Sequence, residues 1–204
     1  MKRKRPSHRL GRPRSFDPRK ALDRALRVFW EKGYEGASLS DLTRAMGINR
    51  PSLYATFGDK EALFRKVLDR YEEGQAAYVY EALKGRTARA VAEGLLRKAA
   101  DGASDPRNPR GCLMVQSALA CGEATDSIRQ ELNARRAAGE AAIRRRLSRA
   151  KSEGDLLRGA DPAELARYLV TVIHGMAVQA AGGASRGKLR RVAETALRAW
   201  PIQD

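Results

Sequence analysis

The chain has 204 residues, which is enough to bury the core of one mid-sized domain or of two small domains that share a core. Its 40 Lys and Arg residues against 24 Asp and Glu give a net charge of +16, which favours a polyanionic partner. No apolar run is long enough for a membrane span, and no apolar segment follows the basic start as it would in a secretory signal. The two cysteines, Cys112 and Cys121, are too few for a disulfide framework. We therefore expect a cytoplasmic protein.

Positive charge is concentrated at the start of the chain. Residues 1–60 contain 15 basic and 6 acidic residues, and the first fourteen residues contain seven basic groups and no acid. Such a run is typical of a solvated, flexible arm, and we assign residues 1–15 to one. The same arm can also bind nucleic acid, so the two interpretations are compatible.

The first two predicted helices have clear start or stop signals, and the second is short. Apolar residues spaced i, i+3, i+4, i+7 predict a helix from about residue 18 to residue 32, with Gly33 as its stop. Ser38 and Asp41 then form a pattern like a capping box, which opens a second helix. Gly47 ends that helix.

A third short helix is predicted to begin near Asn49, where Pro51 falls in the first turn and is tolerated. Gly58 and Asp59 break the chain before a longer fourth helix. Helical periodicity continues around residues 91–99, 112–120, 128–150, 162–176 and 189–200, and residues 104–110 read as a loop. The sequence thus predicts an all-α protein of about nine helices.

The two short helices that meet at the turn residue Gly47 have the pattern of a helix-turn-helix. Neither is long enough to be stable alone, so both must pack against another helix. Packing their apolar residues on the first helix leaves four polar residues outward near the start of the third: Asn49, Arg50, Ser52 and Thr56. In such a motif this segment enters the major groove, where Arg50 can pair with guanine and Asn49 can bind a base or a phosphate. On spacing alone, a surface helix hairpin with solvated polar tips fits equally well.

The sequence resembles the tetracycline-repressor (TetR) family over about residues 11–70. The resemblance rests on three segments in the family's order, Gly-Arg-Pro at 11–13, Phe-Trp-Glu-Lys-Gly-Tyr at 29–34, and Leu-Tyr-Ala-Thr-Phe-Gly-Asp-Lys at 53–60. It implies a DNA-binding transcriptional regulator, most often a repressor that a small-molecule inducer releases from a double-stranded operator. The implied domains are a helix-turn-helix domain at 16–60 and a ligand-binding and dimerisation domain at 61–204.

The resemblance also assigns roles to residues of the DNA-binding module. It makes Tyr54 and Lys60 phosphate contacts and Phe57 a core residue, and the start of the fourth helix attracts phosphate through its dipole as well. Ser38 stands where the family often has Thr, and it can both cap the second helix and touch the DNA backbone. Arg12 and Arg14 can enter the adjacent minor groove, as basic arms do in other helix-turn-helix proteins.

In the body, the resemblance implies a homodimer formed by the last two helices and an inducer held among the middle ones. Small residues in the segment 175–181 allow close helix approach, although an ordinary monomer core would also explain them. The candidate dimerisation residues are Leu169, Ile173, Met176, Leu189, Val192 and Leu197. The candidate ligand-binding residues, chosen only for apolar character and position, are Leu95, Met114, Ala118, Ile143 and His174.

Other functional classes fit the sequence less well. A nucleophilic pair of His174 with Cys112 or Cys121 has no third orienting group, which counts against an enzyme. The two cysteines are nine residues apart and so on opposite faces of a continuous helix, which counts against a metal site; we expect no metal and no cofactor. A regulator that responds through the thiol of Cys112 or Cys121 remains an alternative. Non-specific nucleic-acid binding by charge alone would leave residues 38–60 unexplained.

Overall fold

The computed structural model describes residues 16–119 and 125–201, and these residues form helices joined by turns and loops, with no strand among them. The expected all-α fold is confirmed. The helices are α1 (Pro18–Gly36), α2 (Leu39–Met46), α3 (Arg50–Phe57), α4 (Lys60–Glu73), α5 (Tyr78–Ala82), α6 (Ala88–Ala103), α7 (Leu113–Leu119), α8 (Asp126–Ser152), α9 (Pro162–Ala181) and α10 (Arg186–Arg198).

The structure departs from the prediction at the end of α1 and in one additional helix, α5. Gly33 adopts φ 70° and ψ 177°, which interrupts α1 where the stop was expected, but the chain resumes helical geometry as far as Gly36. The short α5 was not predicted, because its five residues carry too little periodic pattern and no side chain caps its start.

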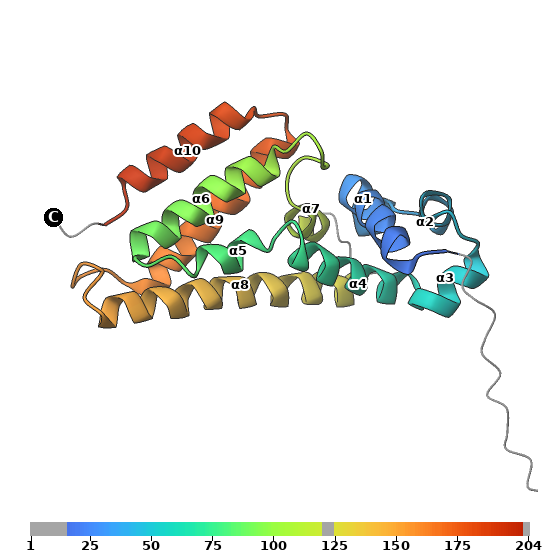
Figure 1. Ribbon diagram of the computed structural model, residues 1–204, viewed down its shortest axis with the longest axis horizontal. Helices are drawn as coiled ribbons and strands as arrows, with labels where there is room; N and C mark the ends of the chain where they lie inside the picture. The colour runs from blue at the N-terminus through green and yellow to red at the C-terminus, as the bar shows by residue number, and fades with distance from the viewer. Residues whose placement is uncertain (1–15, 120–124, 202–204) are drawn as a thin grey trace, which may run out of the picture.

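The helices form a small module and a larger body (Figure 1). Helices α1 to α3 gather at one end, and α8 runs along one side of the molecule from α4 to the far end of the body. In the body α6 packs against α9 and α10, and α9 also packs against α8.

The buried side chains form two hydrophobic cores. The body core combines α6, α9 and α10 with the C-terminal half of α8. The N-terminal core combines α1 to α4 with Leu113, Ile128 and Leu132, which come from α7 and from the start of α8. Because α4 and the start of α8 belong to the N-terminal core, the module and the body are joined through apolar packing as well as through the chain.

Candidate nucleic-acid interface

The start of α2 is fixed by a reciprocal pair of hydrogen bonds. The backbone N–H of Asp41 donates to Ser38 Oγ at 3.0 Å, and the backbone N–H of Ser38 donates to Asp41 Oδ2 at 3.3 Å. Lys32 Nζ lies 2.9 Å from the same carboxylate. The hydrogen bond from Lys32 is the largest cause, and those from Ser38 the next, of a pKa of Asp41 lowered to about 2. The predicted capping box is therefore present and charged at neutral pH.

The turn between α2 and α3 depends on Gly47, which has φ 70° and ψ 33°. A left-handed conformation of this kind suits glycine because it carries no Cβ. Leu42 and Met46 of α2 and Leu53 and Phe57 of α3 are buried in the N-terminal core. Their burial fixes which face of α3 is turned to solvent.

The exposed N-terminal end of α3 carries the residues expected to read DNA. Asn49 is the N-cap, and its Oδ1 accepts the backbone N–H of Ser52 at 2.9 Å, which leaves its amide NH₂ as the group free of the cap. Arg50 is exposed, and its Nη2 donates to Ser40 Oγ of α2 at 3.2 Å. Ser52 is half-buried, and so is Thr56, which lies at the C-terminal end of α3 and not at its start. The side chains at this end are thus partly ordered by contacts within the motif.

Tyr54 and Lys60 lie in different environments. Tyr54 is 48% exposed, so its side chain is accessible for the expected contact with phosphate. Lys60 is the first residue of α4, and its Nζ lies 4.6 Å from the centroid of the Tyr34 ring. Burial lowers the pKa of Lys60, and the nearby charge of Glu35 opposes that shift. Arg12 and Arg14 lie outside the described residues.

A cavity of about 410 Å³ lies between the module and the body. Four of the five expected ligand-binding residues line it: Leu95, Met114, Ile143 and His174. Ala118 is not part of the lining and instead packs against the N-terminal core. Burial, and then the positive charge of Arg136, lower the pKa of His174, so this side chain is neutral at pH 7.

The cavity also has a wall that hydrophobic periodicity in the body did not predict. Trp30 of α1 and Tyr71 of α4 line it together with Cys112. The Tyr71 hydroxyl donates to Cys112 Sγ at 3.4 Å. Burial, with the neighbouring Cys112, raises the pKa of Tyr71 well above its usual value, so the phenol stays protonated. Cys121 lies outside the described residues.

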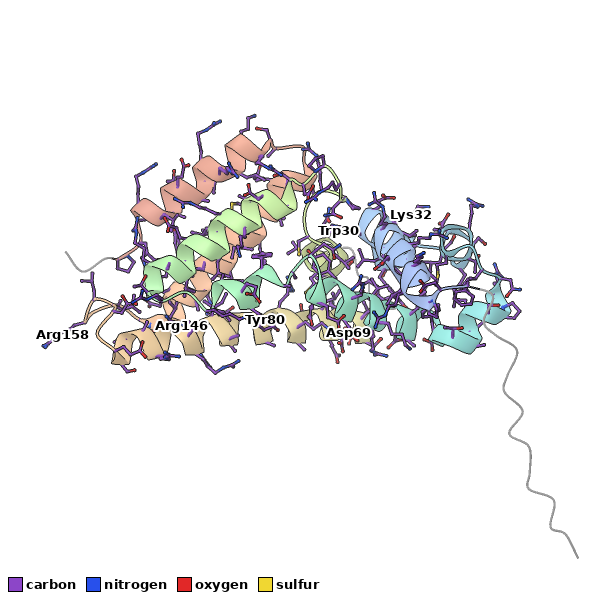
Figure 2. All side chains as sticks on the ribbon, in the orientation of Figure 1. Trp30, Lys32, Asp69, Tyr80, Arg146 and Arg158 are labelled. Atoms are coloured by element: carbon purple, nitrogen blue, oxygen red, sulfur yellow. The ribbon has the colours of Figure 1, made fainter. Side chains whose placement is uncertain are left out.

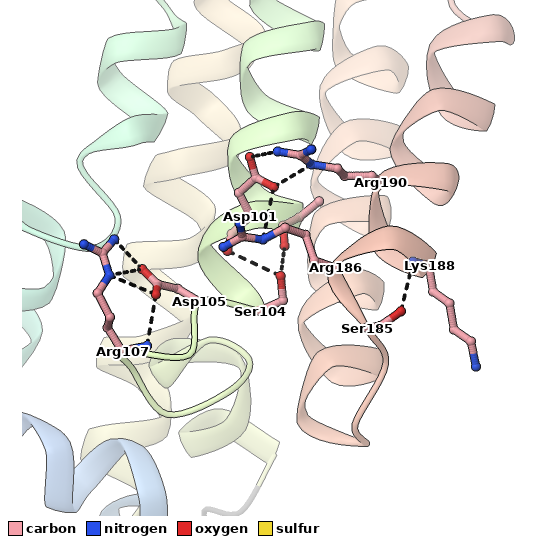
Figure 3. A network of polar contacts seen from close by, with 9 residues as sticks. Asp101, Ser104, Asp105, Arg107, Ser185, Arg186, Lys188 and Arg190 are labelled. Atoms are coloured by element: carbon pink, nitrogen blue, oxygen red, sulfur yellow. Dashed lines mark hydrogen bonds and ion pairs between the residues drawn. The ribbon is translucent and has the colours of Figure 1, made fainter.

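Polar contacts hold the loop beside the cavity and the end of α6 (Figure 3). Arg190 of α10 binds the carboxylate of Asp101 of α6 at 2.8 Å, and Arg107 closes a loop by binding Asp105 at 2.8 Å. Arg27 of α1 donates from Nη1 to the backbone oxygen of Arg107 at 2.9 Å. The loop is therefore tied directly to the N-terminal module.

The expected dimerisation residues differ in their exposure. Leu169, Met176, Leu189 and Leu197 are buried in the core of the single chain, where they pack against its own helices. Ile173 is half-buried and lines the cavity. Of the six, Val192 has the largest exposed fraction, at 44%. Hydrophobic periodicity identified buried positions, but it did not say whether the partner was the chain itself or another copy.

Val192 lies beside an exposed residue of α9 that was not predicted. Tyr168 of α9 is 36% exposed and lies with Val192 of α10 in a shallow groove, whose other lining residues are Val172, Lys188, Arg191, Thr195 and Ala196.

Among the described residues there is no cluster of side chains able to hold a metal ion. None of the described helices is long and apolar enough to cross a membrane.

Comparison with known protein families gives two matches that together span most of the chain. Residues 21–67 match the family model of bacterial regulatory proteins of the tetR family. Residues 88–196 match the tetracyclin repressor-like C-terminal domain. The first match covers α2 and α3 with most of α1 and the first half of α4, and the second covers α6 to α9 and most of α10.

Individual relatives are similar over nearly the whole chain. The HTH-type transcriptional repressor ComR of Escherichia coli strain K12 is 37% identical over 194 residues, which are 94% of this chain and 92% of ComR. A cysteine mutant of the TetR family transcriptional regulator CifR, complexed with a 26bp double-strand operator DNA, is 44% identical with a TM-score of 0.89 over 93% of this chain and 100% of that one. A TetR transcriptional regulator from Rhodococcus sp. RHA1 is 39% identical with a TM-score of 0.62, over 91% of this chain and 100% of that one.

Proposed function

Because this chain belongs to the tetR family of bacterial regulatory proteins and is a sequence-specific DNA-binding transcriptional regulator, we propose that it is a repressor that a small-molecule inducer releases from its operator. The observation that supports release most directly is the position of the cavity. Its lining combines α1 and α4 of the N-terminal core with α6, α8 and α9 of the body, so a bound ligand contacts both parts.

At the DNA, the N-terminal end of α3 enters the major groove. Asn49 and Arg50 lie at the exposed start of this helix, and the buried Leu53 and Phe57 hold the opposite face in the core. The DNA backbone or the flanking bases are bound by five further side chains of this region: Ser38, Ser52, Tyr54, Thr56 and Lys60. The minor groove is the site that we propose for Arg12 and Arg14.

The active form is a homodimer, because two-fold operators are read by two copies of a helix-turn-helix. Its interface uses the outer face of α9 and α10, where Tyr168 and Val192 expose apolar surface. A groove on two adjacent helices that exposes apolar side chains between polar ones fits the same two helices of a second copy.

The test of inducer release is reciprocal linkage. Small molecules are screened for stabilising the chain against heat, and each binder is titrated with and without operator DNA. We expect an inducer to weaken operator binding about 5- to 150-fold, and operator DNA to weaken inducer binding by the same factor. Saturation of the cavity without any change in operator affinity would refute this mechanism.

A second mode of induction is favoured by one contact. Cys112 lines the cavity, and its sulfur accepts a hydrogen bond from Tyr71, so covalent modification of the thiol places a new group beside α4. Iodoacetamide supplies a probe, because the thiolate displaces iodide and acquires a carbamidomethyl group. If the thiol is the sensor, alkylation lowers operator affinity in the wild type and in Cys121→Ser, whereas Cys112→Ser does not respond. An equal loss in all three proteins would count against it.

A further inference from the structure

Helix α1 contributes a side chain to the cavity, although it belongs to the DNA-binding module. Trp30 is only 3% exposed and lines the cavity where α1 meets the body (Figure 2). Its ring meets that of Tyr71 edge to face, with centroids 5.0 Å apart and planes at 90°. The indole is therefore held firmly in place between α1 and α4.

The indole N–H of Trp30 is buried and has no acceptor among the described residues. An indole nitrogen can only donate, and a buried donor without an acceptor destabilises the structure that contains it. The Tyr71 ring provides at most a weak N–H···π contact, and the Tyr71 hydroxyl is already directed to Cys112. Buried polar groups are satisfied so consistently that this one needs an explanation.

One other polar group of the cavity lining also lacks an acceptor, whereas the neighbouring charged groups are paired. Arg135 is held by Glu72 at 3.2 Å, and Glu140 is held by Arg167 at 3.2 Å, so these charges have partners. The Nε of Arg136, another lining residue, is buried without an acceptor. The two unsatisfied lining groups on α1 and α8 are both donors, which a ligand would have to complement with acceptor atoms.

We propose that the cavity takes a largely apolar small molecule carrying an acceptor oxygen, and that this oxygen binds the indole N–H of Trp30. The proposal rests on the proposed function, since it specifies the ligand of the same cavity. The ligand would then contact the DNA-binding module directly, because Trp30 belongs to α1 and α1 packs against α2. Arg27, one helical turn before Trp30, ties the same helix to the loop beside the cavity.

The test compares two probes of nearly equal shape, cyclohexanone and methylenecyclohexane, which differ in a carbonyl oxygen or a methylene group. The full-length protein is labelled with ¹⁵N, and its two indole N–H signals are assigned with Trp200→Phe, which removes the other tryptophan. We expect the Trp30 N–H proton signal to move downfield with the ketone and not with the alkene. The ketone should also bind about fivefold more tightly, the factor expected of one neutral hydrogen bond.

Trp30→Phe keeps an aromatic ring and removes the donor, so the preference for the ketone should disappear in that variant. Equal shifts with both probes, an unchanged preference in Trp30→Phe, or no binding of the ketone at millimolar concentration would overturn the proposal. Operator affinity is measured in the same samples and tests the proposed function separately. A hydrogen-bonded ketone that leaves operator affinity unchanged would support the subsite while refuting induction by that probe.

Discussion

Arg50 and Lys60 are both basic residues of the DNA-binding module, but the structure holds them in different ways. Arg50 is exposed and directed by one hydrogen bond to Ser40, whereas Lys60 lies over the Tyr34 ring with a lowered pKa. The sequence was sufficient to predict that Arg50 begins α3, because Asn49 and Pro51 mark a helix start. It could not predict the Lys60–Tyr34 contact, since this depends on how α1 and α4 pack.

We expect Arg50→Ala to weaken operator binding by about 1–3 kcal/mol and to relax the preference at one base pair of each half-site. The reason is that a guanidinium at the start of the recognition helix can donate two hydrogen bonds to one guanine, at O6 and N7. Binding-site selection on the wild type and the variant measures the change, with thermal unfolding as control. A variant that keeps the wild-type base preference would remove Arg50 from base reading.

Lys60→Ala should instead weaken operator and random DNA by similar factors. A phosphate contact carries no base information, and its loss reduces the slope of log K against log salt by about 0.9. Titrations at several salt concentrations check this, with Lys66→Ala as a matched control, because the ammonium of Lys66 is held by the backbone oxygen of Phe57 at 3.0 Å. A shift in base preference for Lys60→Ala would contradict the assignment.

At the scale of elements, the starts and ends of the helices could be predicted from the sequence, whereas their packing partners could not. Ser38, Asp41, Gly47 and Asn49 act on their own helix ends, so their roles follow from spacing. The dimerisation residues stay a prediction, because an apolar stripe on α9 or α10 fits the chain's own core as well as a second copy.

The capping box of α2 predicts a defined pH dependence. The folded state lowers the pKa of Asp41 from 3.8 to about 2, through Lys32 first and Ser38 next. A lowered carboxylate pKa stabilises the fold above the unfolded value and loses that contribution as pH falls through the folded value. Asp41→Asn should therefore be less stable than the wild type at pH 7, and the difference should narrow between pH 3.8 and about pH 2. Urea unfolding at several pH values measures it, and a difference independent of pH would argue against the ion pair.

One pair of substitutions separates the core of the body from its outer surface. Leu189 is 1% exposed and Val192 is 44% exposed, although both belong to α10. Leu189→Ala should lower the free energy of unfolding by about 2–5 kcal/mol. Val192→Asp should weaken self-association about tenfold or more, because it replaces exposed apolar surface with a charged side chain that must lose its bound water at the interface.

Sedimentation velocity over a dilution series, together with urea unfolding, distinguishes the two effects. A Val192→Asp chain that dimerises as tightly as the wild type would place the interface elsewhere.

For the whole molecule, the sequence was sufficient to predict a basic DNA-binding end and an all-α body, and also four of the residues that line the cavity. It did not indicate that α1 forms part of the cavity wall. Trp30 has the spacing of an ordinary core residue, and its contact with Tyr71 and with the body arises only when α4 and α8 join the N-terminal core. The cavity therefore lies at the junction of the two parts, where α1 and α4 would contact a bound ligand.

The most direct test of the account is the ratio of the affinities for operator and random DNA. An operator is first selected from random duplexes with the full-length chain, and both affinities are then measured by competition at physiological salt. We predict a two-fold symmetric operator bound by two chains, with an affinity about 10³-fold or more above that for random DNA. A chain with net charge +16 that bound only through that charge would give a ratio near one and a salt slope independent of sequence, and this result would contradict the account.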